Sequence, residues 1–323
     1  MPTTVRPYDP DKDYIRIRDF IVDTYAAYGR PYNWLIDRWN FCRYFVIPIH
    51  TFYNTSYFGI PTNPGESHRD ELPYWQASIR VWENEEGDIV GVTHSENEEP
   101  GEAWIQIHPD HTDLYDEMIS TIEETLADRV EDLGYVKLFV NDGSDLEELA
   151  EERGYRKLPF PLGYMEYRIE DRRPVELPEG FTIKSVADED DVEKRRIVRA
   201  LAFGGDYSPS EWPPAWVMRE MQKAPDYRAD LDLFVVAPSG DYVSFCTIWL
   251  DERNGYGNIE PLGTHPEYRG LGLARALMME AFERMAQRGI ELSYMDSGVG
   301  FYKKIGFKDT PYLYSPWIKY FEV

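Results

Sequence analysis

The stretch GTHPEYRGLGLARALMMEA, residues 263–281, decides the fold of this chain. It begins like the end of a strand, passes through two glycines, and ends in a pattern that predicts a helix, because apolar side chains recur every three or four residues. A glycine turn between a strand and a helix exposes backbone N–H groups that have no partner within the helix, and the helix dipole adds positive potential there. The stretch therefore predicts an anion site suited to a pyrophosphate.

The residues of the turn narrow the class of phosphate site. Gly270 and Gly272 lack the Cβ that would block close approach of a ligand, and Arg269 can add charge-assisted hydrogen bonds to phosphate oxygens. No Gly-Lys-Ser/Thr follows, and the spacing is not the Gly-x-Gly-x-x-Gly of dinucleotide sites. The turn therefore differs from both of these common nucleotide loops.

The first half of the chain repeats this stretch without its glycines, as IHPDHTDLYDEMIS at residues 107–120. Two further pairs match in the same order: TVRPYDPDKD (4–13) with TIKSVADEDD (182–191), and GYRKLPFPLGYMEYRIED (154–171) with GFKDTPYLYSPWIKYFEV (306–323). Three matches in register indicate two copies of one domain. The stretch DRRPVELPEG (171–180) suits a linker, because two prolines and a glycine stand among charges. We expect a first domain at 1–172, a linker at 173–180 and a second domain at 181–323.

Each copy is expected to mix helices and strands. In the second copy, apolar periodicity and the turn signals between apolar runs define the elements. We predict strands at 181–186, 231–237, 242–250, 256–264 and 290–295, a last strand in the tail, and helices at 190–203, 271–287 and 300–305. The first copy carries a long aromatic insert, Tyr28 to Trp75, whose rings we expect in the core or an interface, with a lid over a ligand as the alternative.

Composition limits the classes of function. With 323 residues, 42% of them apolar and 29% charged, a folded soluble protein is expected, and the longest apolar runs are too short to cross a membrane. A net charge of −25 repels nucleic-acid phosphates, so we expect no nucleic-acid partner. Two cysteines form neither a disulfide framework nor a metal site, and a cytoplasmic location is expected.

Two elements together resemble a known superfamily. Arg-x-x-Gly-x-Ala after HPEY is similar to the acetyl-CoA signature of the GCN5-related N-acetyltransferase (GNAT) superfamily, and FYKKIGF at 301–307 looks like its Leu-Tyr-x-x-x-Gly-Phe segment. The resemblance covers the whole second copy and, more weakly, the first. It implies an α/β (α+β) fold of two tandem GNAT-like domains, each a mixed, mostly antiparallel central sheet flanked by helices.

The resemblance also implies roles for individual residues. The pantetheine arm of acetyl-CoA would pair with the strand end at Leu262, Gly263 and Thr264, whose N–H groups would stabilise an oxyanion. The pyrophosphate would lie on Arg269, Gly270, Leu271, Gly272, Leu273 and Ala274. Tyr302 matches the tyrosine that protonates the leaving thiolate, with a packing role as the alternative. Glu260 is the candidate general base, with a structural carboxylate as the alternative, and Met295 replaces a commonly seen asparagine.

The first copy lacks the residues of this predicted site. Aligned on His-Pro, Thr112, Asp113 and Tyr115 replace Arg269, Gly270 and Gly272. An acidic side chain near a helix start would repel phosphates, and a tyrosine would fill the space. The histidines of HPDH, His108 and His111, have no evident third ligand nearby, so a surface or capping role is favoured over zinc.

The sequence therefore predicts a tandem acyltransferase whose second domain binds acetyl-CoA and whose first domain is a degenerate copy. The expected reaction is direct transfer of acetyl to a primary amine of a small, cationic acceptor, without a metal. The aromatic stretch Trp212–Trp216 lies where the family often lines the acceptor site, with a rigid packed turn as the alternative. Two other functions stay open: a non-catalytic CoA-binding or interaction module, and an acyltransferase acting on a peptide or protein amine. No pattern indicates an oligomeric state.

Overall fold

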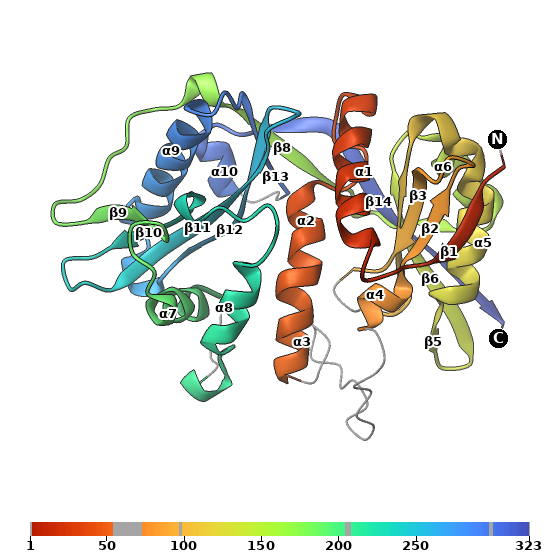
Figure 1. The fold of residues 1–323 in the computed structure, drawn as a ribbon, viewed down its shortest axis with the longest axis horizontal. Coiled ribbons are helices and arrows are strands. Elements are labelled where there is room, and N and C mark those ends of the chain that lie inside the picture. Colours follow the sequence, from red (N-terminus) through yellow and green to blue (C-terminus); the bar gives the residue numbers. More distant parts are fainter. Residues whose placement is uncertain (1, 54–72, 97–98, 204–207, 297–299, 323) are drawn as a thin grey trace. The chain divides into compact units, whose positions relative to one another are not determined.

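The chain folds into two compact units. A computed structural model describes residues 2–53, 73–96, 99–203, 208–296 and 300–322 (Figure 1). The first unit comprises residues 1–42, 50–164 and 310–323, and the second comprises 43–49 and 165–309. Each unit contains its own set of paired strands and its own buried core.

The second unit is built on the sheet β9-β10-β11-β12-β13-β8. Neighbouring strands are antiparallel except for the parallel pair β12 and β13. The strands are β9 (Thr182–Ser185), β10 (Asp232–Val236), β11 (Tyr242–Asp251), β12 (Tyr256–Thr264), β13 (Leu292–Met295) and β8 (Leu162–Arg168). The helices are α7 (Val192–Phe203), α8 (Ala215–Met221), α9 (Leu273–Ala286) and α10 (Gly300–Ile305).

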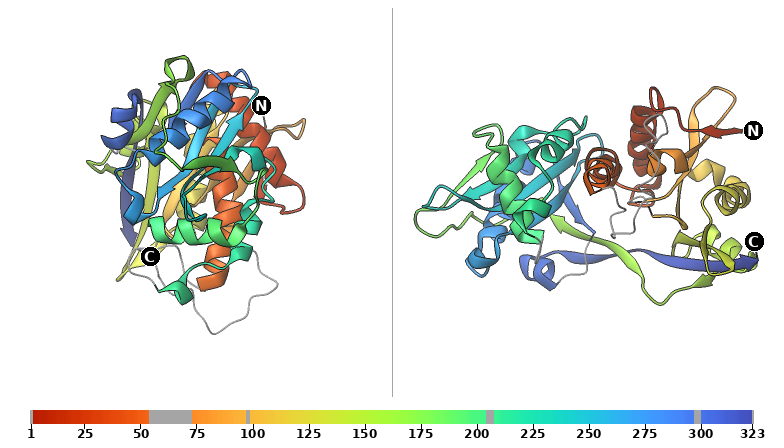
Figure 2. Two further views of the ribbon diagram at one scale, coloured as in Figure 1. Left: turned by 90° about the vertical axis from the view of Figure 1, so that its left-hand side faces the viewer. Right: turned by 90° about the horizontal axis from the view of Figure 1, so that it is seen from below.

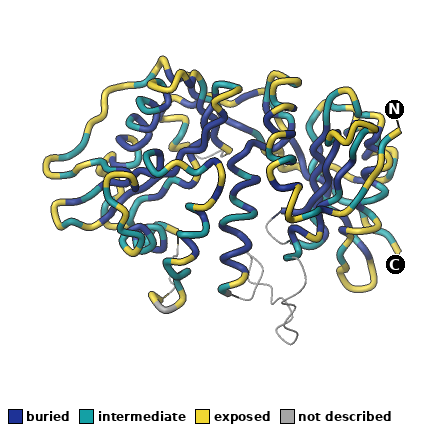
Figure 3. Tube along the Cα trace, in the orientation of Figure 1, coloured by how far each residue is buried: buried dark blue, intermediate teal, exposed yellow. Residues whose placement is uncertain are grey.

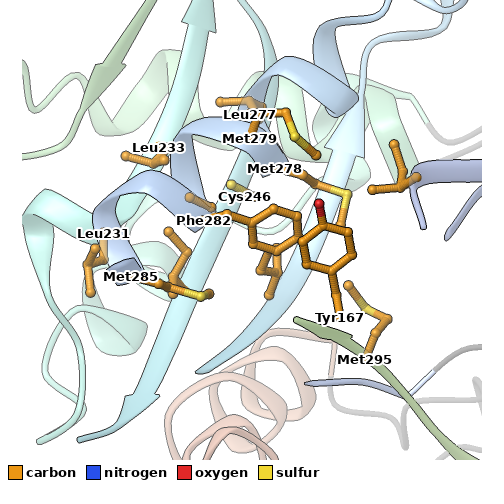
Figure 4. Close-up of a cluster of buried hydrophobic side chains, with 14 of the residues drawn as sticks. Tyr167, Leu231, Leu233, Cys246, Leu277, Met278, Met279, Phe282, Met285 and Met295 are labelled. Carbon is orange, nitrogen blue, oxygen red and sulfur yellow. The ribbon is translucent and has the colours of Figure 1, made fainter. Parts of the chain in front are cut away.

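Helices cover both faces of this sheet. Side chains alternate along the strands, so each strand contributes residues to the core on both faces. Cys246 and Ile248 of β11 pack with Leu277 and Phe282 of α9 in one buried cluster (Figure 4). Phe245, on the opposite face, packs with Val198 of α7 in a second cluster. The strands of the sheet are accordingly buried along most of their length, while the connecting turns are exposed (Figure 3).

The first unit repeats the same strand order, β1-β2-β3-β4-β6-β14, again with one parallel pair, β4 and β6. Its strands are β1 (Thr4–Pro7), β2 (Arg80–Glu83), β3 (Ile89–His94), β4 (Glu102–Ile107), β6 (Leu133–Asn141) and β14 (Lys308–Glu322), with β5 (Asp128–Val130) and β7 (Arg156–Lys157) beside them. Its helices are α1 (Asp13–Tyr28), α2 (Ile36–Phe41), α4 (Tyr74–Ser78), α5 (Tyr115–Thr125) and α6 (Asp145–Glu152). The duplication expected from the sequence is therefore present in the topology.

The last strand of each copy completes the sheet of the other copy. Met165 to Arg168 of β8 pair with β13 in the second unit. Tyr314 to Glu322 of β14 pair with β6 in the first unit, where the chain ends (Figure 2). The compact units therefore differ from the segments 1–172 and 181–323 that the sequence predicts, since residues 165–171 group with the second unit and 310–323 with the first.

The aromatic insert contributes core residues. Trp34, Trp39 and Trp75 are 3%, 0% and 0% exposed, as expected for packing residues. After α2 the helical path continues through a π-helical turn, Cys42–Val46, into α3 (Ile47–Tyr53), and residues 43–49 belong to the second unit. The segment GIPTNPGES, within 54–72, lies outside the described residues.

Three further findings concern only the residues that the structure describes. None of their helices is both long enough and apolar enough to cross a membrane. They include no group of three or more His, Cys, Asp or Glu side chains placed to hold a metal ion. Cys42 and Cys246 are both buried and free of a disulfide.

Candidate functional site

The candidate site lies where two parallel strands separate. Strand β12 pairs with β13 from Tyr256 to Asn258, and its register with β11 shifts between Cys246 and Ile248, opposite the segment that follows. The later part of β12 stays paired with β11 as far as Thr264. Its other edge leaves β13, so backbone N–H and C=O groups there are available to a ligand.

A histidine forms the corner between β12 and the glycine turn. The N–H of His265 donates to the carbonyl oxygen of Val243 at 2.9 Å. Its ring Nδ1 accepts from the N–H of Glu267 at 3.1 Å and so caps the short 3₁₀ turn Pro266–Tyr268. The first copy has the same corner, where Nδ1 of His108 accepts from the N–H of Asp110 at 3.2 Å. The capping role expected for His108 is thus observed, and His265 shares it.

The two glycines of the turn are required by backbone conformation. Gly270 and Gly272 have φ values of 83° and 81°, a region that strains side-chain-bearing residues. A Cβ at either position would meet no protein atom within 4 Å, so the space beside both is open. Gly272 is the N-cap of α9, and no side chain caps this helix. The first N–H groups of α9 therefore face open space.

Gly263 is required by close packing and not by its backbone conformation. A Cβ there would lie 2.6 Å from the ring of Phe245 and 2.9 Å from the Cβ of Ala202. The aromatic ring packs under the strand end, so only glycine lets β12 lie this close to α7.

These elements surround a cavity of about 520 Å³, within the range of about 300–1,000 Å³ typical of small-molecule sites. It is lined by Leu262, Gly263, Thr264, Tyr268, Arg269, Gly270, Gly272, Leu273, Ala274, Arg275, Phe301, Tyr302, Lys304 and Ile305. Every residue predicted to hold the cofactor lies in this lining except Leu271, which is 47% exposed and lines the neighbouring cavity.

The charge of the lining is opposite to that of the chain. The described residues that line the cavity include Arg269, Arg275 and Lys304 and no Asp or Glu, although the chain has a net charge of −25. The guanidinium of Arg269 donates to the carbonyl oxygens of Thr264 and Ala202 at 3.2 and 3.1 Å. These bonds hold a positive charge beside the glycine turn. The cavity therefore favours an anion.

Tyr302 lies in this cavity, on α10, and is partly buried. Its ring meets those of Phe301 and Phe307 at centroid distances of 5.2 and 5.8 Å. Burial, and after it the negative charge of Glu260, raises the pKa of Tyr302 to about 12. The phenol therefore holds its proton at neutral pH and is available as a proton donor.

Glu260 is exposed and lies outside the lining of the cavity, on the segment of β12 that has left β13. Its backbone oxygen accepts from Nε1 of Trp249 at 2.6 Å. Its charge contributes to the raised pKa of Tyr302, so the two groups interact electrostatically. Met295, which replaces the asparagine of the family pattern, is 1% exposed and belongs to the core (Figure 4). Trp212 and Trp216 lie outside the cavity lining.

Five lining residues were not predicted: Tyr268, Arg275, Phe301, Lys304 and Ile305. The sequence held a signal for two of them. Arg275 follows directly after the glycine motif, and Lys304 follows Tyr302 by two residues. Both basic side chains were therefore expected near the predicted anion site.

The corresponding place in the first unit is filled. Strand β4 pairs with β6 only at Glu102 and Ala103 and then separates. The guanidinium of Arg38 lies over the rings of Trp34 and Trp104, at 4.7 and 4.2 Å from their centroids, and leaves a space of about 20 Å³.

Two residues of the predicted site are also replaced in the first unit. Tyr115, which stands where the second copy has Gly272, is 3% exposed, and its hydroxyl lies 2.8 Å from that of Tyr32. The N–H of Phe307 donates to the carbonyl oxygen of Tyr302, and in the first copy the N–H of Tyr155 donates to that of Ala150. Ala150 therefore stands in the place of the phenol.

Comparison with known proteins agrees with this geometry. Residues 204–307 match the family model described as the acetyltransferase (GNAT) family. A mycothiol acetyltransferase of Paenarthrobacter aurescens (strain TC1) is 26% identical over 156 residues, which are 44% of this chain and 48% of that protein. The chain thus spans about half the length of this curated relative.

Two solved structures share the fold across nearly the whole chain. A GCN5-related N-acetyltransferase from Sphaerobacter thermophilus has a TM-score of 0.56 at 19% identity and covers 98% of this chain and 95% of its own. A tandem GNAT protein from the clavulanic acid biosynthesis pathway has a TM-score of 0.60 at 12% identity. This similarity covers 99% of this chain and 98% of that protein. The chain therefore has the fold of tandem GNAT proteins, and its residues 204–307 are similar to the GNAT acetyltransferase family.

Proposed function

We propose that the chain transfers an acetyl group from acetyl-CoA to the primary amine of a small, cationic acceptor. The observation that carries this proposal is the cavity at the end of β12, whose described lining residues include three basic side chains and no carboxylate. In so acidic a chain, such a lining favours a polyphosphate. The match of residues 204–307 to the GNAT family supports acetyl-CoA as that ligand.

The donor would be bound along the cavity by backbone groups at two places and by the side chain of Arg269. The N–H groups at the start of α9, together with Arg269, would hold the pyrophosphate, because unpartnered helix amides and a guanidinium both favour phosphate oxygens. The free edge of β12 at Leu262 to Thr264 would pair with the amides of the pantetheine arm. This pairing would place the thioester near Tyr302.

Transfer would then need one proton acceptor and one proton donor. Glu260, or a water that it holds, would accept a proton from the acceptor's ammonium, and the freed amine would attack the thioester carbon. Backbone N–H groups of β12 would stabilise the charge on the carbonyl oxygen. As the C–S bond breaks, the sulfur would take the phenolic proton of Tyr302, and the proton that the attacking nitrogen loses on forming the amide would restore the phenol. The exposed Glu260 carboxylate would also attract a cationic acceptor.

The first unit would take no part in this chemistry. Its strand separation is filled by Arg38, and Ala150 replaces the phenol. The proposed location is the cytoplasm, because Cys42 and Cys246 are buried and neither forms a disulfide.

Calorimetric titration with CoA tests the donor site. Wild type is expected to bind CoA, and Arg269→Glu is expected to weaken binding more than about tenfold, because a favourable charge becomes a repulsive one. Arg228→Glu is the matched control, since the Arg228 guanidinium is also exposed and also donates to two backbone carbonyls, those of Pro225 and Tyr227. Absence of CoA binding, or equal losses in both variants, would contradict the donor assignment.

Thiol release with a panel of amines tests the reaction. The panel comprises an aminoglycoside, a polyamine, an amino acid and a short peptide. Faster release with one of the small amines than with the peptide is the expected result. Tight CoA binding without release for any amine would instead support a non-catalytic CoA-binding module, and a preference for the peptide would support a peptide acceptor.

A further inference from the structure

The strand that carries Glu260 is interrupted by a bulge. Between two regular stretches of pairing with β11, the two residues Glu260 and Pro261 of β12 lie opposite the single residue Thr247. A bulge of this kind breaks the hydrogen-bond ladder and redirects the side chains of the bulged strand. Proline adds to the break, because it has no N–H to donate. The direction of the Glu260 side chain therefore depends on groups other than the ladder that hold the bulge.

An indole of the neighbouring strand holds one side of the bulge. Nε1 of Trp249 donates to the backbone carbonyl oxygen of Glu260 at 2.6 Å, which is shorter than the usual N–H···O distance of about 2.9–3.0 Å. Trp249 pairs with Asn258, so Glu260 is its diagonal neighbour on the same face, within reach of a long aromatic side chain. The indole is 3% exposed, so water competes little for this bond. Because a peptide unit is planar, holding this oxygen also holds the plane that joins Glu260 to Pro261.

A buried ion pair holds the β11 side of the bulge. The hydroxyl of Thr247 donates to Oδ1 of Asp232 at 3.2 Å, and the same oxygen accepts from Nη2 of Arg195 at 3.0 Å. These three side chains are buried and come from β11, β10 and α7. Thr247 is therefore a fixed support, and the indole bond fixes the bulge relative to it.

The bulge stands where the proposed chemistry takes place. Before it, β12 pairs with β13 as far as Asn258. After it, the free edge of β12 lines the donor cavity from Leu262 onward. The carboxylate of Glu260 is near enough to Tyr302 for its charge to contribute to the raised pKa of the phenol. A rotation of the peptide between Glu260 and Pro261 would therefore move the carboxylate relative to both the strand edge and the phenol.

We propose that Trp249 is a positioning residue for acetyl transfer, whose indole N–H holds the bulge so that the Glu260 carboxylate faces the acceptor amine at the free edge of β12. The inference rests on the proposed function, in which Glu260 accepts the proton of the acceptor's ammonium. Trp249 lies outside the lining of the donor cavity. The indole therefore sets the rate of transfer through Glu260 and adds nothing to the affinity for the donor.

Steady-state kinetics of Trp249→Phe test the proposal, with a small amine that the wild type acetylates. Phenylalanine keeps an aromatic ring and lacks the N–H. We expect kcat to fall about tenfold or more, because displacement of a catalytic group slows transfer steeply, while calorimetry shows unchanged affinity for CoA. If this variant does not fold, Trp249→Met fills the space without a donor and takes its place in the same measurements.

Trp39→Phe is the matched control in the first unit. Nε1 of Trp39, which is 0% exposed, donates to the backbone carbonyl oxygen of Tyr14 at 3.2 Å. The control thus loses the same kind of buried bond, far from Glu260 in the sequence. It should lower Tm about as much as Trp249→Phe does and leave kcat as in the wild type.

A double-mutant cycle separates positioning from a general structural effect. Glu260→Gln should lower kcat by about 10²–10⁴-fold, as for the loss of a general base. In that background Trp249→Phe should lower kcat by less than about a further twofold, because the group that the indole positions is gone. An equal loss in both backgrounds would show that the effect does not pass through Glu260, and the proposal would be wrong.

The remaining outcomes separate this proposal from the proposed function. Wild-type kcat in Trp249→Phe would refute the positioning role and leave acetyl transfer standing. Wild-type kcat in Glu260→Gln would refute both the assigned base and the positioning role, while CoA binding would stand. If the wild type releases no thiol with any amine, the proposed function fails, and the positioning role fails with it.

Discussion

Replacement of Gly272 by alanine separates the backbone role of this glycine from its role beside a ligand. Gly272 has φ 81°, and a Cβ there would meet no protein atom within 4 Å. Gly240, in the hairpin between β10 and β11, has φ 86° and equally open space, and it lies outside both cavity linings. In this left-handed region a non-glycine residue costs about 1 kcal/mol, so both alanine variants should lose about 2–4 °C in Tm.

The two variants should differ only in ligand binding. The added methyl of Gly272→Ala would point into the open space where we place the pyrophosphate, and calorimetry should show CoA affinity reduced by about tenfold or more, a loss of at least about 1.4 kcal/mol. Gly240→Ala should bind CoA as wild type does. Retained affinity in Gly272→Ala would refute the placement of the pyrophosphate. Equal loss in both variants would show that the effect comes from stability.

Three further predictions concern the chemistry and the fold. Tyr302→Phe should lower kcat by about 10²–10⁴-fold at unchanged CoA affinity; since the pKa of Tyr302 is raised to about 12, wild-type activity should not fall between pH 7 and 10 through loss of this proton. Asp232→Asn should destabilise the chain by about 3–5 kcal/mol, because it leaves the buried Arg195 guanidinium, 3.0 Å from Asp232, without its charge partner. Asp230→Asn, which removes the charge of an exposed ion pair with Arg288, should lower the free energy of unfolding by under about 1 kcal/mol, and urea titration of both variants measures the difference. Residues 173–323 expressed alone lack β8 and should give much less soluble protein than the whole chain; equal yields would show that β8 is dispensable.

Much of the second unit could be predicted because its signals are local. Strand β12 and helix α10 begin and end at the predicted residues, and α9 differs from its predicted range by two residues at the start and one at the end. A glycine or a proline stands within three residues of each boundary, and in α9 apolar side chains recur every three or four residues. Where both kinds of signal agree, propensity and packing favour the same element.

The site could be predicted only in part. The glycine turn and Tyr302 carry a recognisable spacing, and the structure places both at one cavity. The packing role of Gly263 was not predictable, because it depends on Phe245, which is distant in the sequence. The neighbouring cavity, which the linker helps to line, was not predicted for the same reason, since a charged stretch such as Arg173 to Glu176 carries no periodicity that indicates what it packs against.

The exchange of the last strands explains why the sequence did not indicate which strand completes which sheet. The two segments have matching patterns, GYMEYRIED and SPWIKYFEV, so either fits either sheet by side-chain alternation. The exchange also gives a structural reason to retain a copy that lacks the glycine turn and the phenol. Tyr167 of β8 comes from the first copy, yet its ring stacks on Phe282 at 4.3 Å in the core of the second unit. Loss of the first copy would remove this strand and open the core that supports α9, so the degenerate copy stays necessary for the fold of the unit that carries the site.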